Sequence, residues 1–203
     1  MLIDRYQNYI NNRILELKTA QLIKSDKDRL NGSIWDFVLM GCLVEIVAKL
    51  NCTNKSLYTF DKISKLFNDR LPKYRIPSYK THDNINDVPE QIYMVMRCGL
   101  IHSLSLVPDE KYKEKKKYEK HWRKGSLLLS HKGNHLQMMT WSPDGEPFEA
   151  CQLDYSSMLD DMQTALDAIF RDAKQDTALS VHIETFVKAN PILGLVPAIP
   201  RDT

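Results

Sequence analysis

The chain has 203 residues, of which 43% are hydrophobic and 27% are charged, and its formal net charge at pH 7 is +2. This length and composition are typical of one globular domain with an ordinary core. Because the net charge is small, the chain as a whole is not a basic nucleic-acid-binding protein. Any basic surface for such a partner must be local.

Cysteine spacing and the N-terminus predict a reduced, cytoplasmic protein. The four cysteines show neither Cys-x-x-Cys pairing nor zinc spacing. The first residues lack the apolar stretch of a signal peptide. The apolar segment 34–50 contains Asp36, Glu45 and Lys49 and is short for a membrane span, so we interpret it as a buried helix.

The first half of the chain shows apolar residues at helical intervals. The predicted helices are 4–23, 34–50, 58–71 and 88 to about 102. Ser33 can cap the second helix, Pro72 ends the third, and Asp87 can cap the fourth. Residues 72–86 have no periodicity and contain prolines, which predicts a loop.

The second half begins with a densely charged segment and continues with three short β-type patterns. The predicted strands are 126–131, 135–141 and 148–153. Gly133-Asn134 predicts the turn between the first two strands, and 142–145 the turn before the third. Two more helices are expected, at 155–174 after a capping Asp154 and at 177–189. An apolar, proline-containing tail follows at 190–203.

These elements predict a mainly α protein, a helical bundle with an inserted three-stranded antiparallel β-meander. Residues 1–203 are expected to form a single domain. Within it, residues 109–153 would be the insertion, which comprises the charged segment and the meander.

One arginine and one histidine have a spacing that indicates a catalytic site. Arg97 and His102 enclose four residues at the end of the fourth predicted helix. Arginine offers a donor fork that fits phosphate oxygens, and histidine exchanges protons near neutral pH. Arg75 and His82 enclose six residues in a polar stretch, which we interpret as a chance match.

The context of the Arg97 match is apolar, where a polar pair is costly to bury unless it is paired or used. The structural alternative is that Arg97 meets a carboxylate and His102 caps the helix end. In a straight helix the two positions lie about 140° apart around the axis and about 7.5 Å along it. A loosened helix at Gly99, the reach of the long Arg97 side chain or a second subunit could bring them together.

The segment Arg97 to His102, with an apolar helix before it and an amphipathic helix after it, resembles the HEPN superfamily of prokaryotic helical ribonucleases. That family carries an Arg-x4–6-His motif on an up-and-down helical bundle, so the resemblance implies an up-and-down arrangement of the helices in this chain. The resemblance covers 34–50, 88–102 and 155–174. It implies that Arg97 binds the scissile phosphate and that His102 transfers the proton at the 2′-hydroxyl. It further implies that no metal or cofactor takes part and that two protomers share one cleft.

Several further residues are supporting candidates. Cys98 and Gly99 lie inside the motif; the family usually has a polar residue where this chain has Cys98. Glu45 could orient Arg97 or His102, but an ion pair with Lys49 at i+4 is favoured.

The histidines beside the predicted turn form one more possible group. His131 and His135 could face each other across two strands, with His121 as a loose third ligand. A metal site there is disfavoured.

The charged segment is the candidate RNA-binding surface, because cations attract phosphates and aromatic rings stack on unpaired bases. A solvated face is the alternative. The candidate residues are Lys111, Lys113, Lys115, Lys116, Lys117, Lys120, Trp122, Arg123 and Lys124.

The sequence therefore predicts a metal-independent endoribonuclease that acts as a toxin or in phage defence. Its expected partners are RNA, a second copy of the chain and an antitoxin or regulatory protein, with no membrane. The alternative is a non-catalytic helical module that binds a protein or nucleic acid. Cys98 and the apolar setting favour the module, whereas the Arg97–His102 pair with Gly99 favours the enzyme.

Overall fold

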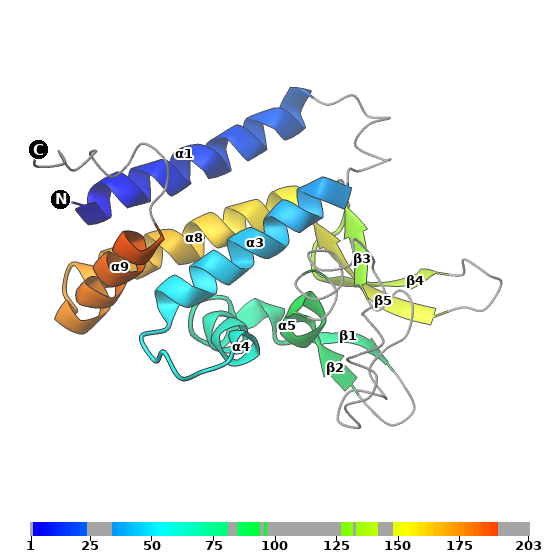
Figure 1. Cartoon of the computed structure of the whole chain (residues 1–203). Coiled ribbons are helices and arrows are strands. Elements are labelled where there is room, and N and C mark those ends of the chain that lie inside the picture. The colour runs from blue at the N-terminus through cyan, green and yellow to red at the C-terminus, as the bar shows by residue number, and fades with distance from the viewer. Residues whose placement is uncertain are drawn as a thin grey trace, which may run out of the picture.

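A computed structural model of the chain describes residues 2–23, 34–80, 85–93, 96, 127–131, 133–141 and 148–190. This part of the chain is mainly helical and carries a small three-stranded sheet at one end (Figure 1). The predicted fold class is therefore confirmed at the level of a mainly α protein with a small three-stranded sheet.

The helices follow the predicted periodicity closely. They are α1 (Leu2–Ile23), α3 (Ile34–Asn51), α4 (Thr59–Arg70), α5 (Val88–Gln91), α8 (Tyr155–Ala173) and α9 (Thr177–Ala189). The Asp154 cap of α8 is confirmed, because its carboxylate accepts a hydrogen bond from the Ser157 amide at 2.8 Å. Pro72 follows the end of α4, as expected from its missing amide hydrogen.

The long helices α1, α3 and α8 lie side by side, and α9 packs at the end away from the sheet (Figure 1). Helices α3 and α8 both begin at the sheet and run in the same direction (Figure 1). The alternation expected of an up-and-down bundle is not seen in this pair. Helix α3 is the buried helix that its sequence predicted, since Met40, Val47 and Leu50 are fully buried. In the described ranges, no helix combines the length and the apolarity needed to cross a membrane.

The segment 72–86 was predicted to be a loop without regular structure, but its described residues, 72–80 and 85–86, contain a 3-10 turn and two paired strands, so that expectation is wrong. It contains a 3-10 turn η1 (Pro72–Tyr74) and an antiparallel hairpin of β1 (Pro77–Lys80) and β2 (Ile85–Asp87). Asp87 is the last strand residue, and the Val88 amide donates to the Ile76 carbonyl at 3.0 Å. Tyr74 is fully buried, so tertiary packing supplies the order that local periodicity did not indicate.

The helix predicted from 88 to about 102 begins at Val88 but is α-helical only to Gln91. The backbone at Ile92, Tyr93 and Met96 has the wider π-helical hydrogen-bonding pattern. The remainder of that predicted helix, from Arg97 on, lies outside the described residues.

The sheet consists of β3 (Leu127–Ser130), β4 (Gln137–Trp141) and β5 (Phe148–Asp154), in the order β3-β5-β4. Strand β5 pairs antiparallel with β4 and parallel with β3. The predicted antiparallel meander is therefore wrong in one connection, because β3 and β4 do not form a hairpin.

Burial explains why β5 takes the central place. Its residues Ala150, Cys151 and Leu153 are fully buried, whereas Met138 and Met139 of β4 remain more than one third exposed. A central strand is covered by a neighbour on each side, so the most apolar strand is best placed there.

Candidate functional site

The two residues that carry the sequence motif, Arg97 and His102, lie outside the described residues, as do Cys98 and Gly99. The candidate RNA-binding residues between 111 and 124 also lie there. The structure does describe the residues directly before the motif. Ile92 is 1% exposed and Met96 is fully buried in the main core. The core therefore holds the chain at Ile92 and again at Met96, the residue preceding Arg97.

Helix α4 provides one wall for this anchored segment. The ring of Phe60 meets the ring of Tyr93 edge-on, with centroids 5.2 Å apart. Short π-helical segments are uncommon in proteins and occur often beside functional sites. The segment that leads into Arg97 is thus both packed and irregular.

Glu45 forms the ion pair that was favoured for it. Its carboxylate lies 2.6 Å from the ammonium of Lys49, one turn along α3. This i,i+4 contact confirms the predicted ion pair between Glu45 and Lys49.

Around His135, three elements meet in a polar cluster. His135 Nε2 lies 3.2 Å from Asp161 Oδ2 of α8. The Tyr74 hydroxyl of η1 donates to the same oxygen at 2.8 Å, and Lys73 Nζ lies 2.6 Å from Asp161 Oδ1. The Asp154 amide donates to His135 Nδ1 at 3.1 Å, which assigns the ring proton to Nε2. Both ring nitrogens are therefore engaged in holding the β5–α8 junction.

The acidity of this cluster follows from its contacts. Burial alone would raise the pKa of Asp161, but hydrogen bonds from His135, Lys73 and Tyr74 outweigh burial and lower that pKa. Burial, and then the neighbouring Asp161 carboxylate, raise the pKa of Tyr74 well above its ordinary value. The cluster thus contains a stable carboxylate and a phenol that stays protonated.

A second histidine–aspartate pair joins the sheet to α3. His131 Nε2 lies 2.7 Å from Asp36 Oδ2, and the Gln21 amide of α1 donates to the same oxygen at 3.0 Å. The imidazole ring stacks on Tyr155 and meets Phe37 edge-on. With its side chain 2% exposed, His131 is closed to a substrate.

Tyr155 adds an unusual feature to this second pair. Its hydroxyl is buried and has no hydrogen-bond partner within the described part of the chain. Burial, and then the Asp36 carboxylate, raise the pKa of Tyr155. A buried hydroxyl without a partner normally costs stability, so ring packing compensates for it here.

The expectation that His131 and His135 face each other is wrong, because each histidine contacts an aspartate on a different helix. Among the described residues, no group of three or more His, Cys, Asp or Glu side chains is arranged to hold a metal ion.

Sequence reasoning missed these two clusters as sites, although a signal for each was present. Asp36 stands at the start of an otherwise apolar helix, and Asp161 lies between apolar positions of α8. A carboxylate on a buried face predicts a polar partner. The partners themselves, His131 and His135, come from other elements and have no local signature.

The two histidine–aspartate pairs, His131–Asp36 and His135–Asp161, connect the segment between β3 and β4 to helices α3 and α8. No serine, threonine or cysteine of the described chain is hydrogen-bonded to either imidazole, so neither pair forms a nucleophile–base arrangement there. No family model matches the sequence, and neither a curated protein nor a solved structure is similar enough to count as a match.

Proposed function

We propose that the protein is a metal-independent endoribonuclease whose chemistry is carried by Arg97 and His102. The proposal is supported by the Arg-x4-His spacing, by the resemblance of that segment to HEPN ribonucleases and by a mainly helical fold. RNA is the substrate, and no cofactor takes part. A toxin or phage-defence role would follow from uncontrolled RNA cleavage.

The observation that carries the proposal is the anchoring of the segment before the motif. A permanent cation cannot be buried without a partner, whereas Met96 beside it is fully buried. The core therefore fixes the backbone at the residue before Arg97, and a functional side chain needs such rigid support. The π-helical pattern at Ile92 and Met96 fits the same interpretation.

The proposed reaction is a transesterification. His102 takes the proton from the 2′-hydroxyl, and the 2′-oxygen attacks the phosphorus. The bond to the 5′-oxygen breaks as that oxygen takes a proton from water, and His102 returns its own proton to water afterwards. Arg97 neutralises the charge that develops on the phosphate oxygens. The products are a 2′,3′-cyclic phosphate end and a 5′-hydroxyl end. The lysines between 111 and 124 would hold the strand.

A cleavage assay with EDTA present tests the proposal. Wild-type protein should cut single-stranded RNA and leave 2′,3′-cyclic phosphate ends. Arg97→Ala and His102→Ala should each lower the rate by about 100-fold or more, because each removes one catalytic contribution.

The second Arg–His pair of the sequence, Arg75 and His82, which we interpret as a chance match, supplies the control for that assay. Arg75→Ala and His82→Ala change the same residue types in the other Arg–His pair, which encloses six residues instead of four, and both variants should cleave at the wild-type rate. Undiminished cleavage by the His102→Ala variant would refute the assignment of the proton-transfer role.

A second candidate function is a non-catalytic interaction module. It is favoured by apolar side chains on the surface of α3, where Trp35 is 57% and Leu39 is 48% exposed. Residues four apart share one helix face, so the two form a patch suited to a protein partner. Expression discriminates between the candidates, because a ribonuclease slows its host and His102→Ala relieves that effect, whereas a module has neither effect.

A further inference from the structure

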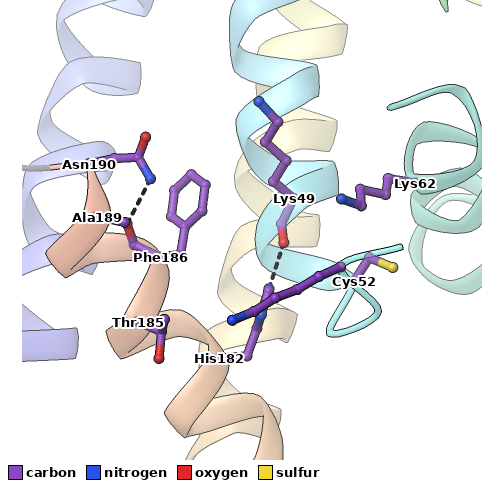
Figure 2. Close-up of a pocket in the computed structure, with 9 residues that line it drawn as sticks. Lys49, Cys52, Lys62, His182, Thr185, Phe186, Ala189 and Asn190 are labelled. Atoms are coloured by element: carbon purple, nitrogen blue, oxygen red, sulfur yellow. Dashed lines mark hydrogen bonds between the residues drawn. The ribbon is translucent and has the colours of Figure 1, made fainter. Parts of the chain in front are cut away.

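A pocket of about 230 Å³ is lined by residues of α3, α4 and α9 and of the connection after α3 (Figure 2). Helix α9 lies at the end of the molecule away from the sheet (Figure 1). The pocket is bordered by the C-terminal ends of α3 and α9 and by the first turn of α4. The side chains that matter most for its chemistry are Lys49, Lys55, Lys62, His182, Phe186 and Ala189. None of these residues belongs to the proposed catalytic motif.

The pocket carries surplus positive charge. Three of its lining residues are lysines and none is a carboxylate. Lys49 is neutralised by Glu45 at 2.6 Å. Lys55 and Lys62 form no ion pair with any described residue, whereas Lys65 on the same helix as Lys62 pairs with Asp69 at 2.8 Å. Lys62 extends from α4 toward α3, as Figure 2 shows.

Helix ends do not cancel this charge. The C-terminal ends of α3 and α9 are negative poles, which would oppose an anion. Two carbonyls near the pocket are, however, already occupied by donors. His182 Nε2 donates to the Lys49 carbonyl and the Asn190 amide to the Phe186 carbonyl, each at 2.8 Å (Figure 2). The unpaired ammonium groups therefore dominate the potential.

Part of the pocket wall is apolar. Phe186 packs partly against the core, Cys52 is 2% exposed, and Ala189 completes this side. A bare inorganic ion would leave that wall uncovered, whereas a planar group could cover it. A phosphomonoester carries a charge of about −1.5 to −2 at pH 7, which matches two unpaired lysines better than a carboxylate does.

We propose that this pocket binds a phosphomonoester carried on a planar apolar group. The phosphate lies between Lys55 and Lys62, and the planar group lies against Phe186 and Ala189. The ligand is either a free small molecule or the phosphorylated end of a nucleic-acid strand, since both present this chemistry. The site contains neither Arg97 nor His102, so ligand binding in the pocket can be tested separately from the ribonuclease activity.

Calorimetric titration of the full chain with phenyl phosphate tests the site. Binding should be saturable at one site, and inorganic phosphate and phenol should each bind at least about tenfold more weakly, because each supplies only half of the contacts. Lys55→Gln and Lys62→Gln should each weaken phenyl phosphate binding by about tenfold. Ala189→Trp, which fills the pocket, should abolish it.

Lys65→Gln is the matched control, because it removes a lysine from the same helix outside the pocket and should leave the affinity unchanged. Wild-type affinity in the Lys55→Gln/Lys62→Gln double variant would overturn the proposal, as would no binding of phenyl phosphate at millimolar concentration. A 5′-phosphorylated oligonucleotide that binds more tightly than both phenyl phosphate and its 5′-hydroxyl counterpart identifies the ligand as a strand end. Binding of phenyl phosphate alone identifies it as a small molecule. In either case Arg97→Ala should bind as the wild type does.

Discussion

Two carboxylate side chains, those of Asp36 and Asp161, connect the sheet to the helices. Asp36 and Asp161 each accept hydrogen bonds from a histidine and from a second donor on another element. Such contacts are strong because one partner is ionised and both are shielded from water. Loss of either aspartate would leave a buried donor without an acceptor.

At the residue scale we expect Asp161→Asn to lower the free energy of unfolding by about 2 kcal/mol at pH 7, because an amide cannot satisfy all three donors. The pKa of Asp161 is lowered from its ordinary value of 3.8, so its carboxylate stabilises the fold above that value. This contribution is lost as the pH falls through the lowered folded-state pKa. Urea unfolding measures the difference in the free energy of unfolding between the wild type and Asp161→Asn. This difference should be smaller at about pH 3 than at pH 7.

Asp160→Asn is the control, because Asp160 is the neighbouring residue of α8 and pairs with Lys18 at 2.6 Å while 69% exposed. An exposed ion pair contributes at most about 1 kcal/mol, so this variant should lose little stability. Equal losses in the two variants would show that the Asp161 cluster is not a special stabilising contact.

At the element scale, the turn between β3 and β4 is the unusual part of the sheet. The sequence Gly133-Asn134 predicted a hairpin, but the chain instead passes across the end of β5, where the Leu136 amide donates to the Gln152 carbonyl at 2.8 Å. Gly133 has a φ of +153°, and Leu136 a φ of 58°. Residues with a side chain rarely adopt positive φ angles, so the conformation at position 133 requires a glycine.

We therefore predict that Gly133→Ala lowers the free energy of unfolding by about 1–3 kcal/mol. Part of this cost is steric, since a Cβ atom at Gly133 would lie 2.5 Å from Gln152 Nε2. The double variant Gly133→Ala/Gln152→Ala removes that clash and should recover only part of the loss, because the strained φ remains. Thermal unfolding followed by circular dichroism measures both effects.

Asn134→Ala, at the exposed neighbouring position, controls for replacement within the turn and should be close to neutral. A neutral Gly133→Ala variant would contradict the backbone conformation described for this turn.

At the scale of the whole molecule, the open question is whether one chain or two form the proposed catalytic site. Arg97 and His102 would lie on different sides of a straight helix, about 140° apart. A two-fold axis beside them would place two arginines and two histidines in one groove. The apolar patch of Trp35 and Leu39 on α3 is a surface that a second copy could cover.

We predict a homodimer in sedimentation experiments at micromolar concentration. Leu39→Lys should shift the protein toward monomer, because a charge in the interface must be desolvated without a partner. If the site is composite, the same variant should also lose RNA cleavage. Val181→Lys, at a comparably exposed apolar position of α9, should remain dimeric. A wild-type protein that sediments as a monomer would refute the composite site.

Local sequence patterns were sufficient to predict the elements that depend on residues close together in the sequence. Helical periodicity located α1, α3, α4, α8 and α9, and a single capping residue, Asp154, marked the start of α8, because these features act within one or two turns. The Arg97–His102 motif stays a prediction from spacing, because both residues lie outside the described part of the chain.

Tertiary structure alone decided the features that join distant segments. The partner of His131 is Asp36, 95 residues away, and that of Tyr74 is Asp161, 87 residues away. Strand order was also decided in this way, since β5 takes the centre by its burial among helices and strands rather than by its turns. Such pairings depend on which surfaces meet once the helices pack, and short-range sequence patterns carry no record of that packing.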